Sequence, residues 1–123
     1  MKLKLRSIVS AGELDKERLT LLVTDRTDLG DYLVAQAEFV EGQLTTNLIH
    51  TIWFPVKSVE KGDLVVIYTK RGQNKERSLL SDRKSHFFYL DLDNSIWEEQ
   101  SRGAVILHAP TWESKSTEEI KQI

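Results

Sequence analysis

The densest run of side chains that could bind a ligand lies between residues 70 and 85. This segment carries six basic and two acidic side chains, although the whole chain has a net charge of −2. The basic residues are Lys70, Arg71, Lys75, Arg77, Arg83 and Lys84. A cluster of lysine and arginine attracts phosphate groups, with an affinity that falls as the salt concentration rises. The segment is therefore a candidate binding site for nucleic acid or another polyanion.

Other features of the same segment favour a solvated loop without a ligand. Glu76 and Asp82 dilute its positive charge, and no aromatic residue lies inside it for stacking on bases. The segment separates two strongly predicted strands, so we expect a long loop. Loops on rigid β scaffolds are frequent binding surfaces. Both interpretations stay open at the level of sequence.

The residues that most often ligate metals are scattered. His50, His86 and His108 lie far apart in sequence, each in or beside a predicted strand, and their spacing gives no sign of a zinc site. Residues 91–95 open like a calcium loop, but the sixth and twelfth positions hold Ile96 and Arg102 in place of glycine and glutamate. We expect a turn there, and neither a metal site nor a cofactor.

The sequence lacks the common motifs of catalytic sites. The chain has no Gly-x-Ser-x-Gly motif and no glycine-rich phosphate loop. The carboxylate pairs Glu98-Glu99 and Glu118-Glu119 are adjacent, so on a strand their side chains would face opposite sides. We therefore expect a protein that is not an enzyme and has no catalytic residues.

Short apolar segments separated by turn residues dominate the chain. Several alternate apolar and polar residues, as half-buried strands do. About seven such segments, with few helix signals, favour an all-β antiparallel sandwich or barrel. The predicted strands are residues 3–8, 18–23, 32–39, 48–54, 64–69, 86–90 and 104–108. Residues 116–120 resemble a helix start, but a frayed, charged terminus is the preferred interpretation.

Size and composition indicate one domain. A chain of 123 residues accommodates a single core, which we assign to residues 1–112, followed by a charged tail at 113–123. There is no cysteine, which excludes disulfides and thiolate metal sites. Because no apolar run reaches the length of a signal peptide or membrane span, we expect a cytoplasmic protein, unless a leader precedes this sequence.

The three tryptophans are candidates for either the core or an interface. Trp53 lies beside Phe54 and Trp97 follows Ser95-Ile96, and we expect both in the core, where large aromatic side chains supply much of the burial. Trp112, near the end of the chain, fits either a cap on the sandwich or an exposed contact residue.

The second half of the chain resembles lamin-tail domains. Residues 59–69 place the Gly62-Asp63 turn before a strand that ends in Tyr68-Thr69, and residues 95–97 lead through a turn to the apolar strand at 104–107. Glu17, Leu19, Leu21 and residues 28–33 are similar to the family's opening strands. The resemblance implies an immunoglobulin-like sandwich that acts as an interaction module without shared catalytic residues.

These observations favour a non-enzymatic module that binds an as yet unidentified protein partner through a sheet edge or exposed loops. The alternative is a binder of nucleic acid or another polyanion through the basic loop at residues 70–85. Self-association through a strand edge is a further option that the sequence leaves open.

Overall fold

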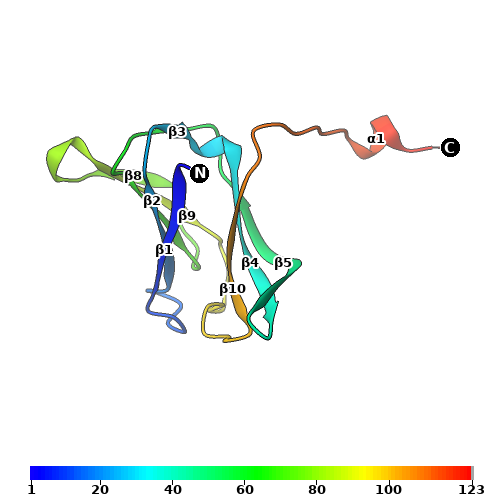
Figure 1. The fold of residues 1–123 in the computed structure, drawn as a ribbon, viewed down its shortest axis with the longest axis horizontal. Coiled ribbons are helices and arrows are strands. Elements are labelled where there is room, and N and C mark those ends of the chain that lie inside the picture. Colours follow the sequence, from blue (N-terminus) through cyan, green and yellow to red (C-terminus); the bar gives the residue numbers. More distant parts are fainter. Residues whose placement is uncertain (123) are drawn as a thin grey trace.

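Two β-sheets packed face to face form the body of the protein in a computed structural model that describes residues 1–122 (Figure 1). The larger sheet has five strands in the order β1-β2-β7-β9-β8. The strands are β1 (Leu3–Val9), β2 (Arg18–Val23), β7 (Leu64–Tyr68), β9 (Lys84–Tyr89) and β8 (Lys75–Ser78). The smaller sheet has the order β10-β4-β5, and these strands are β10 (Arg102–His108), β4 (Tyr32–Val40) and β5 (Gln43–Trp53).

Short elements close the ends of the sandwich. A two-stranded ribbon pairs β3 (Thr27–Asp28) with β6 (Ser58–Val59). Two 3₁₀ turns, η1 (Leu29–Asp31) and η2 (Leu80–Asp82), and one helical turn, α1 (Thr117–Ile120), complete the chain. Within residues 1–122, no helix is long and apolar enough to cross a membrane.

The all-β sandwich expected from the sequence is confirmed, with two differences in detail. There are about ten strands instead of seven, because β3, β6 and β8 are short and lack an apolar pattern. In addition, β7 and β9 run parallel, whereas all other strand pairs are antiparallel. After β7 the chain first forms the edge strand β8 and then forms β9, which lies between β7 and β8 in the sheet. As a result β9 runs parallel to β7 and antiparallel to β8.

The core lies between the two sheets and follows the alternation of the strands. On β2 the side chains of Leu19, Leu21 and Val23 point inward and are almost fully buried. Val65 and Ile67 of β7 belong to the same core cluster. Burial of such aliphatic side chains contributes roughly 1.5–3 kcal/mol each. The core therefore explains why these strands were recognisable in the sequence.

The tail leaves the sandwich beyond β10 and extends away from it (Figure 1). A frayed terminus was the wrong prediction for residues 116–120, because α1 forms one helical turn with a capping box. The Ser116 hydroxyl accepts a hydrogen bond from the Glu119 N–H, and the Glu119 carboxylate accepts one from the Ser116 N–H. These two bonds satisfy backbone donors that a helix start would otherwise leave free.

Candidate functional site

The sequence predicted one long loop at residues 70–85, but the structure shows that this basic segment is interrupted by a strand. Its middle forms the edge strand β8, which pairs antiparallel with β9. All four residues of β8 are exposed, so backbone pairing and not burial places them in the sheet. This pairing brings the basic segment to the outer surface of the five-stranded sheet. There it lies beside residues of other strands, which are not part of the 70–85 segment.

Three of the six predicted basic residues lie over aromatic rings of that surface. Lys70 Nζ is 4.8 Å from the centre of the Tyr68 ring, and Lys75 Nζ and the Arg77 guanidinium carbon are each 5.9 Å from the centre of the Phe87 ring. A cation at this distance from a ring face is attracted by the ring's quadrupole. The rings therefore hold these cationic groups at the sheet surface.

A fourth cation comes from the predicted strand at residues 18–23, but it was not among the candidate binding residues. The guanidinium carbon of Arg18, on β2, lies 5.8 Å from the centre of the Tyr68 ring. Arg18 is paired in register with Tyr68, which is paired in turn with Tyr89. The rings of Tyr68 and Tyr89 stack with centres 5.5 Å apart, and those of Tyr68 and Phe87 with centres 6.3 Å apart.

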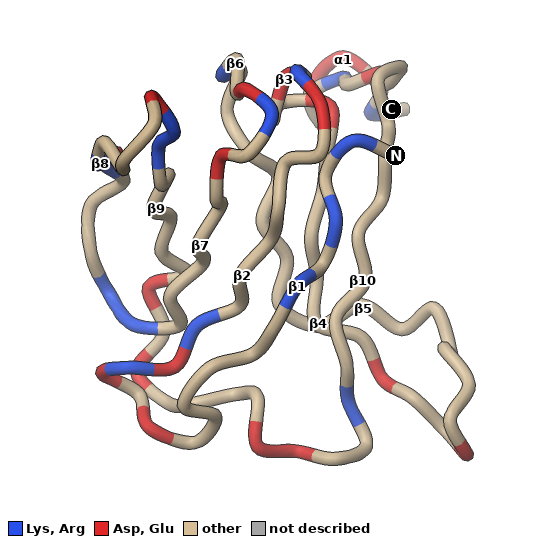
Figure 2. The backbone as a smooth tube through the Cα atoms, turned by 60° about the vertical axis from the view of Figure 1, so that its left-hand side comes forward, with Lys and Arg blue, Asp and Glu red and all other residues tan. Residues whose placement is uncertain are grey.

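We call the set formed by Arg18, Lys70, Lys75 and Arg77 with the rings of Tyr68 and Phe87 the cationic face. The outward positions of β2, β7, β9 and β8 hold no carboxylate, because Glu76 lies on the opposite side of β8, in register with His86. Figure 2 shows basic segments along β1 and at one end of β2, while the acidic ones gather in the connecting loops. The cationic face is thus positive although the chain is acidic.

The other three predicted residues are engaged elsewhere. Arg71 forms two hydrogen bonds with the Asp93 carboxylate, at 2.8 and 3.0 Å. Lys84 forms an ion pair with Glu76. Arg83 packs its side chain beside Gly62 and lines a shallow groove with Leu79 and Leu80. The structure therefore divides the predicted cluster into three cations held over rings and three with other contacts.

The outer surface of the three-stranded sheet has the opposite chemistry. Strand register places uncharged residues there along all three strands, and we call this surface the apolar face. Its positions are Leu33, Ala35, Ala37 and Phe39 of β4, Leu44, Leu48, Thr51 and Trp53 of β5, and Gly103, Val105 and Leu107 of β10. Ala35 and Ala37 are themselves buried, so the larger residues supply the exposed area of the face. The aromatic ring of Phe39 lies directly over Gly103, where a side chain would not fit.

Two tryptophans stand at one end of the apolar face. Trp53 was predicted in the core, which is wrong: register with Leu33 places it outside, and 48% of its surface is exposed. Its indole N–H donates a hydrogen bond to the Gly30 carbonyl, and Trp112 contacts its ring edge to face, with centres 4.9 Å apart. Trp112 is 59% exposed, so it does not form a buried cap on the sandwich. Trp97 is buried as predicted.

The candidate metal ligands do not converge. His108 stacks on Tyr32, and His86 is buried beside Asp63, whereas His50 lies at the rim of a surface depression. Asp91 and Asp93, from the predicted turn, accept hydrogen bonds from the Gly72 N–H and from Arg71. Within residues 1–122, no three histidine, cysteine, aspartate or glutamate side chains are close enough to share a metal ion.

Glu17 is a buried polar centre that the sequence analysis did not identify as a site. Its carboxylate, fully buried, accepts hydrogen bonds from three backbone N–H groups and from the hydroxyl of Thr69. The backbone donors belong to Gly12, Ile96 and Trp97. Burial acts to raise the pKa of Glu17, but the four hydrogen bonds outweigh it and lower the pKa below its ordinary value.

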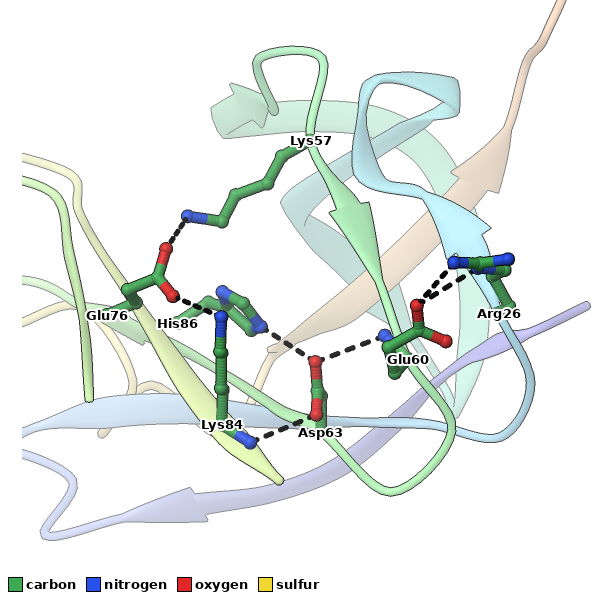
Figure 3. Close-up of polar contacts among 7 residues, drawn as sticks. All are labelled: Arg26, Lys57, Glu60, Asp63, Glu76, Lys84 and His86. Carbon is green, nitrogen blue, oxygen red and sulfur yellow. Dashed lines mark hydrogen bonds and ion pairs between the residues drawn. The ribbon is translucent and has the colours of Figure 1, made fainter. Parts of the chain in front are cut away.

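Asp63 is a second buried carboxylate, shown in Figure 3. It accepts hydrogen bonds from the N–H groups of Glu60 and Lys84 and from Nε2 of His86, at 2.9–3.1 Å. Burial opposes ionisation here too, but these bonds and the nearby His86 lower the pKa of Asp63. At the edge of this cluster, hydrogen bonds from Lys57 and Lys84 lower the pKa of Glu76 to about 2. The cluster joins β6, β7, β8 and β9.

We expect the domain to lose stability in acid. Because the pKa values of Glu17 and Asp63 are lower in the folded chain than in the unfolded chain, the unfolded chain binds more protons as the pH falls. Their contribution is complete above the ordinary carboxyl pKa and is lost below it. Urea unfolding should give a constant free energy between about pH 7 and 5 and a decreasing one below about pH 4.5. A free energy that stayed constant down to about pH 3 would contradict this interpretation.

No protein-family model and no curated protein sequence matches the chain. The resemblance to lamin-tail domains therefore stays a prediction that rests on the residues quoted for it. The two outer surfaces of the sandwich differ in chemistry, one cationic and one apolar, and both are accessible to a partner.

Proposed function

We propose that the domain is a non-enzymatic protein-interaction module in which two copies associate through their apolar faces. The observation that carries the proposal is an uncharged sheet surface on which Leu44, Leu48 and Leu107 are each 38–43% exposed. Monomeric soluble proteins rarely leave contiguous apolar surface of this kind in water. Burial of this surface against another protein removes the unfavourable free energy of exposing apolar side chains to water.

A second copy is the partner that this chemistry fits best. The apolar face has no charge, so two identical faces meet without repulsion and without leaving a buried ion unpaired. Two-fold symmetry requires a self-complementary surface, and packed sheets accept each other at a small angle between strands. At one end of the face Trp53, fixed by Gly30 and Trp112, provides a rigid aromatic anchor of a type enriched among residues that dominate binding energy.

The size of the surface predicts a weak dimer. Three strands of about seven residues cover roughly 350 Å² in projection, from ordinary strand spacings. Stable complexes usually bury about 800 Å² of accessible surface on each partner. The exposed Trp112, which contacts Trp53, enlarges the contact at its margin. We therefore expect a dissociation constant on the order of 10–100 µM.

Sedimentation velocity between about 1 and 300 µM should show a monomer converting to a dimer. The association should not weaken as salt rises, because the face holds no charges. Replacing Leu107→Lys should raise the dissociation constant by about 30-fold or more, since a lysine would then be buried without a partner. Val56→Lys is the matched control, because Val56 is 86% exposed and lies off the apolar face.

A protein that stays monomeric throughout this range contradicts the proposal, as does equal dimerisation of the Leu107→Lys and Val56→Lys variants.

The expected family and the expected cellular location of the protein belong to the same proposal. Membership of the lamin-tail family is supported by the turn and strand residues quoted above, and a cytoplasmic location by a chain without cysteine.

A further inference from the structure

The cationic face lies on the opposite side of the sandwich from the apolar face, so the proposed dimer leaves it uncovered. Within residues 1–122, none of its four cations forms an ion pair. Elsewhere on the same domain Arg71 and Lys84 both have carboxylate partners. The face therefore concentrates basic side chains whose charge is not neutralised by the protein.

We propose that the cationic face binds single-stranded nucleic acid, with the four cations on phosphates and with bases against the rings of Tyr68 and Phe87. Single-stranded nucleic acids are bound by surfaces that combine cations, which follow the backbone, with aromatic rings on which bases stack. The sequence showed only the cations, because the rings lie in β7 and β9, outside the 70–85 segment. The register of the sheet brings the two sets together.

The position of the cations explains how one surface can serve both groups of the ligand. Lys70, Lys75 and Arg77 now lie over the rings that a base would need. A phosphate offers each cation a stronger, charge-assisted partner than a ring does. Binding of the backbone therefore moves the cations aside and uncovers the rings. Tyr89 lies beside Tyr68 on the same face, where its ring packs between the Tyr68 ring and the backbone of Gly72.

Charge complementarity alone would also fit a polyanion without bases, so the rings decide the assignment. An acidic peptide or a sulfated polysaccharide has no flat π system to stack on them. Binding that depends on the cations and is indifferent to the rings would therefore identify a different ligand. This distinction gives the experiment its two arms.

The first arm measures binding of a labelled oligothymidylate of about 20 nucleotides by fluorescence anisotropy at about 50 mM salt. Four phosphate contacts predict that the affinity falls with a log–log slope of about −3 as salt rises. The variant Lys70→Glu/Lys75→Glu/Arg77→Glu should lose at least about 100-fold in affinity. The control Lys2→Glu/Lys61→Glu/Lys115→Glu changes the net charge equally, away from the rings, and should bind nearly as the wild type does.

The second arm tests the rings. Tyr68→Leu and Phe87→Leu should each weaken oligothymidylate binding by at least about fivefold and leave heparin binding unchanged. Tyr68→Phe keeps the ring and should bind like the wild type. Thermal midpoints of all variants show whether the sheet is intact. The Leu107→Lys variant, which tests the dimer, should bind oligothymidylate with unchanged intrinsic affinity.

Three results overturn the proposal. The first is no detectable binding of oligothymidylate by the wild type at about 100 µM protein in low salt. The second is equal loss of binding in the two triple variants, which would reduce the effect to net charge. The third is leucine variants that fold normally and still bind oligothymidylate like the wild type, which would leave a polyanion without bases as the ligand.

Discussion

Glu17→Gln is expected to lower the free energy of unfolding by about 3–5 kcal/mol, because the carboxylate serves four donors. One carboxylate oxygen accepts from Gly12 and Trp97, and the other from Thr69 and Ile96. An amide has one accepting oxygen only. The NH₂ group of the glutamine would therefore face at least one buried backbone N–H group. That N–H group would lose its hydrogen-bond acceptor.

The orientation of the introduced amide limits the loss. If the NH₂ group takes the position beside Thr69, the Thr69 hydroxyl can turn and accept from it, so that Ile96 alone is left without an acceptor. The opposite orientation leaves both Gly12 and Trp97 unpaired. Even the better orientation exchanges charge-assisted bonds for neutral ones, which are about half as strong.

Urea unfolding at neutral pH measures this difference directly. Glu13→Gln is the matched control, because the exposed Glu13 lies in the same loop and its carboxylate has no hydrogen bond among the described residues. The control should change stability by less than about 0.5 kcal/mol. A Glu17→Gln protein as stable as this control would show that the carboxylate network does not stabilise the fold.

Asp63→Asn should have the second largest effect, a loss of about 2–3 kcal/mol. The carboxylate accepts from Lys84 on one oxygen and from Glu60 and His86 on the other. An asparagine can keep the Glu60 and His86 bonds, but its NH₂ group then faces the Lys84 N–H. The predicted loss is smaller than at Glu17 because the Asp63 carboxylate serves three donors instead of four, so fewer charge-assisted bonds are weakened.

Thermal and urea unfolding of Asp63→Asn should be compared with Asp15→Asn, whose side chain is exposed. The loss at Asp63 should also diminish below about pH 4, because the unfolded wild-type chain then takes up a proton at this carboxylate before the folded chain does. A loss independent of pH between about 7 and 3 would point to altered packing in place of the lost charge.

Strands with buried, β-branched side chains were predictable from sequence, and polar edge strands were not. The prediction at residues 64–69 matches β7 (Leu64–Tyr68) almost to the residue, because its inward positions need large aliphatic side chains. In contrast, β8 forms through backbone hydrogen bonds with β9, and those bonds place no demand on side-chain polarity. A run such as Lys75–Ser78 therefore looks the same in a loop and in an edge strand.

The errors about side-chain direction have a related cause. Trp53 was expected in the core because an apolar residue is usually buried, but β5 contains two irregularities in its pairing with β4. The irregularity between Leu48 and Thr51 inserts one extra residue and so shifts the alternation. The direction of a side chain therefore depends on the partner strand as well as on its own sequence. Only the register with Leu33 places Trp53 outside.

The candidate sites differ in what the sequence contained. For the cationic face the sequence contains a recognisable pattern, because Phe87 and Tyr89 alternate on one strand and Lys75 and Arg77 on another. The sequence does not show that these two strands pair with each other. The Glu17 network left no signal, because most of its donors are backbone N–H groups, which every sequence supplies. Backbone groups become a site only when the fold aims them at one point.

The wide separation of the Glu17 partners along the chain has a consequence for how the domain folds. The carboxylate bonds to residues 52, 79 and 80 positions further on. During synthesis the Glu17 carboxylate therefore cannot form all of its hydrogen bonds until Trp97 has left the ribosome. Contacts between such distant segments also require slow loop closure, which is typical of all-β domains that fold in milliseconds to seconds. A late-formed contact acts mainly on the unfolding rate, so Glu17 would keep the finished domain closed rather than help it to assemble.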